Sequence, residues 1–452
     1  TKVNFGYNAG QSRSINRIKW LSGPEYYTLL YEMYFNEGRS PFDAERLAGS
    51  RDINTNWFEL TNRVANFQNA DFDISGGNEN TTFRFSASYL QQQAIQLGND
   101  YNRVNLNLRV DHKLSKRLSA TINFAPSFLT KNGLNAYSSV PIAPNVPVFN
   151  ADGSYYAFSN LGVPNPIAIL NQNVNQHEGG ALNGNLRLDY KLLDNLTIST
   201  SIGTNSSVNK QNVFFSPRNA TGSPSNGRAI IYDRQDFSWI SFTQVNYVPK
   251  FKNQLHKLDI VGGFEARHQS AKLLTGQGTG FTYYRLNELS NAATRNAASS
   301  ININRTTSFY GQAGYSFADK YFVTLSSRLD AASVFGASVN STVNSAIGGG
   351  WVLSKESFFP KWKAITSARI RASYGTTGNS RIGSYEARGL YTFNNEGYNG
   401  NASSALRSAP NPNLGWERSY KTNLGLDITL AKRFTITLDV YQNIVDDAIS
   451  SI

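Results

Sequence analysis

The chain has 452 residues and contains 24 tyrosines and 27 phenylalanines but no cysteine, which excludes disulfides and cysteine-based zinc or redox sites. No apolar run reaches the roughly 18 residues that a transmembrane helix needs. The formal net charge is +12 at pH 7, but the basic residues are scattered, which argues against nucleic-acid binding. A mean hydropathy of −0.40 does not exclude a membrane, because only alternate residues of a barrel strand need be apolar.

Near the amino terminus the sequence predicts a strand over Val3 to Ala9 and then one helix. Ser22 and Glu25 have the spacing of a capping box ahead of residues 27–35, and Gly38 is placed to end the helix. We expect this helix to pack in a loop or at the rim of a sheet. A docking role is the alternative.

Period-two alternation dominates the rest of the chain, as in residues 81–90, where Phe83, Phe85, Ala87 and Tyr89 alternate with polar side chains. Alternation of this kind predicts strands with one apolar and one polar face. We count about sixteen strands in total. The clearest cover residues 81–90, 103–114, 118–124, 185–192, 196–202, 257–267, 309–317, 321–330, 368–375, 421–430 and 433–441.

The links between these strands alternate between short and long. Ser115 to Arg117, Ala318 to Lys320 and Ala431 to Lys432 are short, whereas residues 129–182 and 272–307 form long polar stretches. Short periplasmic turns opposite long extracellular loops are typical of outer-membrane barrels. The sequence therefore predicts an all-β fold, with one large antiparallel transmembrane β-barrel.

The polar positions of several strands carry charges two residues apart, as in Arg109 and Asp111. Such pairs can neutralise one another inside a wide barrel, and a solvated sheet face is the alternative. The side chains that we expect to face the lumen are Arg84, Arg109, Asp111, Arg187, Asp189, Arg328, Asp330, Arg369 and Arg371.

Aromatic residues in the expected loops are candidates for contact with a ligand or a lid, because their rings can stack on sugar rings. They are Tyr155, Tyr156, Phe158, Tyr283 and Tyr284. The alternative is that they pack the loops together.

The sequence offers no catalytic constellation. Its four histidines have no pair at metal-ligand spacing, so we predict no metal site. The glycines at 276, 278 and 280 and the segment 378–384 do not complete a dinucleotide or phosphate-binding motif. We therefore predict no cofactor and no enzymatic activity.

Four blocks of sequence resemble the SusC/RagA family of TonB-dependent outer-membrane transporters: residues 73–118, 309–336, 368–385 and 411–443. Val334 departs from the family pattern, which has a basic residue before Phe-Gly. The resemblance implies a barrel of about 22 strands around a plugged lumen. We expect residues 1–452 to form a partial barrel domain, with the plug domain and the closing carboxyl-terminal strands outside this chain.

The resemblance also implies active import of a large nutrient, a glycan or peptide fragment, across the outer membrane. The implied partners are a SusD-like surface lipoprotein, TonB acting through the absent plug region, and outer-membrane lipid, with no nucleic acid. A passive porin and a secreted β-rich adhesin, carbohydrate-binding protein or carbohydrate-active enzyme are the alternatives.

Overall fold

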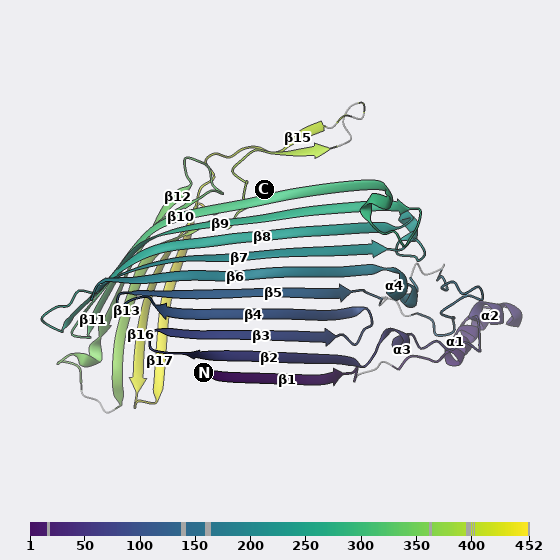
Figure 1. Cartoon of the computed structure of the whole chain (residues 1–452), viewed down its shortest axis with the longest axis horizontal. Coiled ribbons are helices and arrows are strands. Elements are labelled where there is room, and N and C mark those ends of the chain that lie inside the picture. Colours follow the sequence, from purple (N-terminus) through teal and green to yellow (C-terminus); the bar gives the residue numbers. More distant parts are fainter. Residues whose placement is uncertain are drawn as a thin grey trace.

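The computed structural model describes residues 1–15, 19–136, 142–158, 164–360, 364–394, 399, 401 and 403–450. Its main feature is one 15-stranded antiparallel sheet, in which the strands lie side by side in chain order (Figure 1). The hairpin of β14 (Leu390–Asn394) and β15 (Ser403–Ser408) is inserted between β13 and β16 and forms a separate two-stranded sheet. The fifteen strands are β1 (Lys2–Ser12), β2 (Ala65–Gly77), β3 (Thr81–Gln93), β4 (Asn99–Lys113), β5 (Leu118–Gly133), β6 (Val174–Leu193), β7 (Leu196–Phe215), β8 (Arg228–Tyr247), β9 (His256–Phe281), β10 (Ala292–Phe317), β11 (Tyr321–Ala332), β12 (Ser341–Val352), β13 (Ile365–Asn379), β16 (Glu417–Leu430) and β17 (Phe434–Asp446).

The α-helices lie at the end of the sheet where the long connections are (Figure 1). The predicted capping box is confirmed: Glu25 N–H donates to the Ser22 hydroxyl, the Glu25 carboxylate accepts from Ser22 N–H, and Gly38 follows the helix at φ +83°. No helix in the described part of the chain is long and apolar enough to cross a membrane. The helices are α1 (Gly23–Asn36), α2 (Pro41–Ala48), α3 (Trp57–Thr61) and α4 (Pro166–Gln172), with 3-10 turns at Ser223–Ser225, Leu289–Asn291 and Leu353–Lys355.

Two of the predicted short links are tight hairpin turns with both central residues in the left-handed region. Ala318 and Asp319 have φ of 53° and 50°, and Ala431 and Lys432 have φ of 48° and 57°. The Arg433 amide donates to the Leu430 carbonyl at 2.9 Å, which closes the second turn. This geometry matches the right-handed twist of the flanking strands, although glycine and asparagine adopt it at lower cost.

The expectation of a long loop over residues 272–307 was wrong. β9 and β10 have 26 residues each, and they are paired from Ala292 opposite Phe281 to Phe317 opposite His256. Only residues 282–291 therefore form the loop between them. A strand crosses a bilayer in about 9–11 residues, so these strands project well beyond it. On one face of β9 the apolar alternation is interrupted after Ala266 by His268, Ser270 and Lys272, before Leu274 follows. This polar interruption made the outer part of the strand look like a loop.

The register places apolar side chains of successive strands in common rows on one face of the sheet. One row is Phe83, Val110, Ile122, Leu186 and Ile202, and another is Phe264, Phe309, Leu329 and Val343. None of these side chains is buried and most are exposed: Phe309 is 60% exposed and Val343 57%. The hairpin β14–β15 is the only other sheet in the described residues, so no second sheet covers this apolar face.

The buried side chains form small clusters at the loop ends of the strands instead of one central core. Phe214, Ala229, Phe281 and Ala292 make one cluster. Ala332, Val334 and Phe335 make the other, with Trp416 packed against Phe335 at 4.7 Å between ring centroids. Val334 is only 1% exposed, so apolar packing replaces the charged contact that the family pattern implied at this position.

Candidate functional site

The nine side chains predicted to face the lumen all lie on the face opposite the apolar rows. The strand register places several of them in one row across the sheet. Asp111 lies opposite Thr121 of the next strand, and Thr121 lies opposite Arg187 of the strand after it. The same row extends across the following strands to Asp330. In other rows of this face, Arg84 lies opposite Arg109, and Gly350 lies opposite Arg371. We call this surface the polar face. All nine side chains lie on this face, and the exposure of the polar face to a lumen remains a prediction.

Four strands carry an Arg-x-Asp ion pair on the polar face. The shortest N–O distances are 2.9 Å in Arg109–Asp111, 2.8 Å in Arg187–Asp189, 2.8 Å in Arg234–Asp236 and 2.6 Å in Arg328–Asp330. The pair in β8, Arg234 with Asp236, was missed because that strand has weak alternation, although the same spacing would have revealed it. Because water screens exposed pairs of this kind, their main effect is to neutralise a charged surface rather than to stabilise the fold.

Three polar-face contacts reach over an intervening strand. Arg328 of β11 donates a hydrogen bond to Glu265 of β9 at 3.1 Å, and Ser308 of β10 lies in the strand between them. Arg371 of β13 donates to Asp439 of β17 at 3.2 Å. The Tyr310 hydroxyl of β10 donates to Gln244 of β8 at 3.1 Å.

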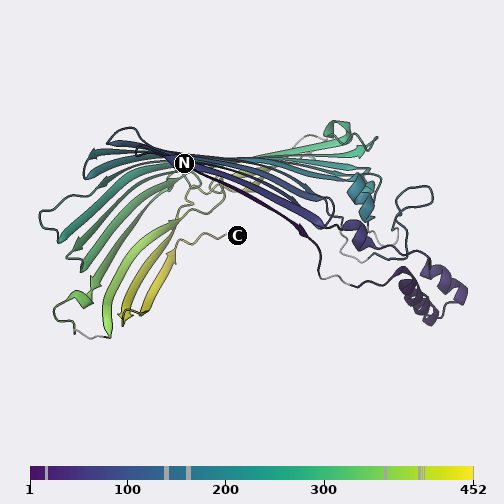
Figure 2. The same ribbon diagram turned by 60° about the horizontal axis from the view of Figure 1, so that its bottom comes forward.

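Side chains converge on the inside of a curved sheet, so these contacts identify the polar face as the concave one. Figure 2 shows the bend that carries the last strands away from the plane of the first. Glu265, Asp439 and Gln244 were missed as site residues because their partners are set by a register that one sequence does not reveal.

The other two predicted arginines differ in their surroundings. Arg84 pairs with Asp73 of β2 at 2.7 Å. The Arg369 guanidinium lies over the Phe322 ring, 5.2 Å from its centroid, and its buried Nε has no hydrogen-bond partner in the described part of the chain. A cation–π contact with Phe322 therefore helps to hold the Arg369 guanidinium.

The middle of the polar face is lined by amides. A hollow of about 580 Å³ lies over β4 to β9, where asparagines of neighbouring strands meet. Asn205 donates to Asn183 across β7 and β6, and Asn185 donates to Ser201 at 2.8 Å. Side-chain amides both donate and accept hydrogen bonds, and Arg267 adds a positive charge to the lining, so this surface suits polar solutes.

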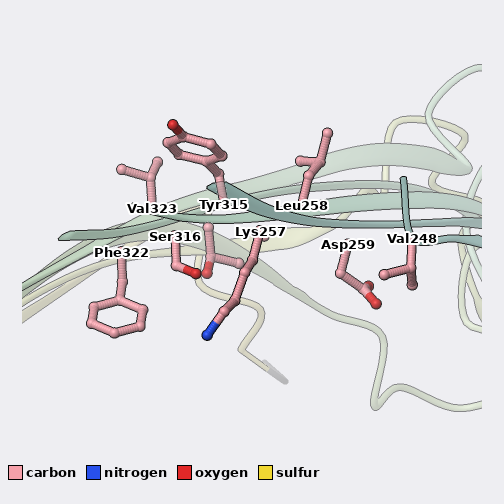
Figure 3. A pocket seen from close by; sticks show the side chains of 10 residues that line it. Val248, Lys257, Leu258, Asp259, Tyr315, Ser316, Phe322 and Val323 are labelled. Carbon is pink, nitrogen blue, oxygen red and sulfur yellow. The ribbon is translucent and has the colours of Figure 1, made fainter. Parts of the chain in front are cut away.

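A second hollow, of about 290 Å³, lies near the short turns at the ends of β9, β10 and β11. Figure 3 shows that its lining alternates between faces: Tyr315 points to one side of the sheet, and Lys257 and Phe322 point to the other. Gly314 lies within this lining, and a Cβ there would meet nothing within 4 Å.

The five predicted loop aromatics fall into two groups. Phe158 is 9% exposed and packs edge-on against Trp57 and Tyr156, and Tyr155 lies 5.0 Å from Phe149 between ring centroids. This group ties loop segments together.

Tyr283 and Tyr284 instead lie in the loop between β9 and β10, where Tyr283 is 52% exposed. The Arg285 guanidinium, followed by the charge of Arg218, lowers the pKa of the Tyr284 hydroxyl below its ordinary value. Any ligand contact by these five residues stays a prediction.

Among the described residues, no group of three or more histidine, aspartate or glutamate side chains is placed to hold a metal ion. The polar side chains of the site are hydrogen-bonding and ion-pairing groups.

A curved antiparallel sheet with an exposed apolar face outside and a charged, amide-rich face inside is the wall of a membrane-spanning β-barrel. Residues 134–452 match the family described as TonB dependent receptor-like, beta-barrel. The chain belongs to this TonB-dependent receptor family.

Curated relatives agree with that assignment. TonB-dependent receptor P39 of Formosa agariphila is 30% identical over 400 residues, covering 84% of this chain and 37% of the relative. TonB-dependent receptor SusC of Bacteroides thetaiotaomicron is 25% identical over 504 residues, covering 100% of this chain and 47% of SusC. The chain therefore spans less than half the length of these relatives.

Solved structures show the same fold. The RagAB peptide transporter superposes with a TM-score of 0.79 at 19% identity, over 98% of this chain and 55% of that chain. The RagAB peptide importer in its open-open state gives 0.78 at 18% identity, over 100% and 54%. The resemblance to SusC/RagA proteins that the four sequence blocks predicted is confirmed.

Proposed function

We infer that this chain forms the barrel wall of an outer-membrane transporter that imports a large nutrient, a glycan or peptide fragment, using energy delivered by TonB. The observation that carries the proposal is the two-faced sheet of a TonB-dependent receptor family member, with an exposed apolar side and a neutralised, hydrogen-bonding side. The chain is thus proposed to be a transporter component and not an enzyme.

The chemistry of the polar face supports passage of a polar solute. Each Arg-x-Asp pair presents both signs of charge within one strand, so a solute meets neither a strongly positive nor a strongly negative wall. The amide hollow over β4 to β9 adds donors and acceptors that can exchange with those of a sugar or a peptide backbone.

The long-loop side supports contact with a lid. β6 to β10 have 20 to 26 residues, about twice the length needed to cross the hydrocarbon core, so they raise the loops above the membrane surface. A SusD-like surface lipoprotein is the proposed partner there. TonB is the proposed partner on the short-turn side, acting through a plug region of the whole protein.

Uptake in cells that carry or lack TonB tests the proposal. The whole protein would be expressed in its outer membrane, and the uptake of a fluorescent oligosaccharide and a fluorescent peptide, both too large for general porins, would be measured. We expect uptake of one probe that stops when TonB is removed, with unchanged entry of a small sugar as the control. Uptake that continues without TonB would instead identify a passive porin and overturn the proposal.

A further inference from the structure

An arginine–tyrosine cluster at the loop-side tip of the sheet has no role in the barrel wall. Arg218 comes from the connection between β7 and β8, and Tyr283, Tyr284 and Arg285 come from the connection between β9 and β10. The Arg218 guanidinium lies over the Tyr284 ring at 4.4 Å, and Arg285 lies at 5.8 Å from the same ring. Two loops therefore bring two cations to one aromatic side chain.

Both loops are fixed from below. Phe214 and Phe281 pack edge-on at 5.2 Å between ring centroids, and Phe281 is only 2% exposed. The Phe281 amide donates to the Asn226 carbonyl at 2.7 Å, which joins the two connections directly. The cluster thus stands on a small buried core rather than on free loop.

The backbone around Arg218 is also held. Ser216 is fully buried, and its amide donates to the Asn173 side chain at 2.9 Å. Asn219 is 8% exposed and donates to both Gln172 and Asn173. Because residues on both sides of Arg218 are anchored to the end of α4, the position of its guanidinium is preorganised, which lowers the entropic cost of binding.

The two guanidinium groups retain binding capacity. Arg285 donates its Nε–H to the Tyr284 hydroxyl at 3.2 Å, and within the described residues no carboxylate lies within ion-pair distance of Arg218 or Arg285. This differs from the polar face, where most arginines have an acidic partner. A guanidinium has five N–H donors, so the cluster has a surplus of donors and of positive charge.

We propose that the Arg218–Tyr284–Arg285 cluster is a recognition site for an acidic saccharide, whose carboxylate or sulfate group the two arginines bind. The exposed Tyr283 ring, 5.6 Å from Tyr284 between centroids, supplies a flat surface beside the charged site on which a sugar ring can stack. The lowered pKa of Tyr284 is consistent with a locally positive site. The inference rests on the proposed import function and assigns its substrate class.

Binding to the purified whole protein in detergent, measured by isothermal titration calorimetry, tests this site. The probes are hexagalacturonate, matched neutral galactohexaose, and hexaglutamate as an acidic peptide. We expect hexagalacturonate to bind more tightly than the neutral sugar. Arg218→Gln and Arg285→Gln should each weaken its binding about tenfold, because each removes a charge-assisted hydrogen bond.

The controls separate the site from general charge effects and from misfolding. Arg51→Gln removes an exposed loop arginine elsewhere and should leave the affinity unchanged. Arg218→Lys keeps the positive charge and should retain part of the affinity for hexagalacturonate. Equal binding of acidic and neutral sugars, an equal loss in Arg51→Gln, or binding of hexaglutamate alone would overturn the proposal. This assay needs no TonB, so its failure is independent of the uptake test.

Discussion

Arg371 of β13 donates to Asp439 of β17 at 3.2 Å, across the full width of β16. The same guanidinium bonds Asp427 of β16 at 2.8 Å. Gly425 lies between Arg371 and Asp439 in the register, and a Cβ there would stand 2.7 Å from the guanidinium carbon of Arg371 and from Asp439 Oδ1. The missing side chain is what allows one arginine to bridge three strands.

Gly425→Ala should displace this bridge and lower the free energy of unfolding, because the added Cβ would collide with the Arg371 guanidinium and the Asp439 carboxylate. The control is Gly314→Ala on the same face, where a Cβ meets nothing within 4 Å. That variant should be neutral or about 0.5–1 kcal/mol more stable, because alanine restricts the unfolded chain. Urea unfolding in lipid vesicles measures both, and an equal response would contradict the bridging role.

Arg328→Gln should cost more than Arg109→Gln. Arg328 joins Asp330 and Glu265, its side chain is 37% exposed, and those carboxylates are 18% and 22% exposed. Its removal leaves two partly buried negative charges, for which we expect a loss of about 1–3 kcal/mol. The side chains of the Arg109–Asp111 pair are 54% and 38% exposed, so water screens this pair and its loss should cost less. The same unfolding assay compares them, and equal losses would refute the ranking.

Replacing Ala431-Lys432 by Asn-Gly should stabilise the protein by about 1–2 kcal/mol, because both positions have positive φ and the new residues adopt it at lower cost. Lys116→Gly, in a turn without positive φ, should give no gain and serves as the control. A loss of stability in the Asn-Gly variant would mean that the Ala431 and Lys432 side chains matter more than the turn geometry.

Glu356 lies in the short-turn segment between β12 and β13. The Tyr321 hydroxyl at 2.7 Å, followed by the Trp351 indole N–H at 3.0 Å, holds the pKa of Glu356 below its ordinary value of 4.5. Because the folded pKa is the lower one, this stabilisation is present above the ordinary carboxyl pKa. It is lost as the pH falls through the folded value.

Glu356→Gln should therefore reduce the loss of stability between neutral and acidic pH, as measured by thermal unfolding at a series of pH values. Glu45→Gln, an exposed acid in α2, should leave the pH profile unchanged. An unchanged profile in Glu356→Gln would show that the hydrogen bonds to Glu356 do not contribute.

The alternation along single strands was enough to predict the sheet and the shared face of Arg84, Arg187 and Arg371, because the side-chain period of a strand is two. Contacts between strands were not predictable. The link from Arg328 to Glu265 joins residues 63 apart in the chain, and it depends on register and curvature. The Arg218–Tyr284 contact depends on how two loops pack over Phe281, which no local pattern encodes.

The apolar face should contact lipid, and the polar face should contact water. Because the sequence has no cysteine, single cysteines can be introduced to test this directly. Single cysteines at Leu325 and Phe309 on the apolar face, and at the neighbouring polar-face positions Thr324 and Gln312, would be labelled with a fluorophore in vesicles containing brominated lipid. We expect strong quenching at Leu325 and Phe309 and little at Thr324 and Gln312. Equal quenching at all four positions, or stronger quenching on the polar face, would contradict this expectation.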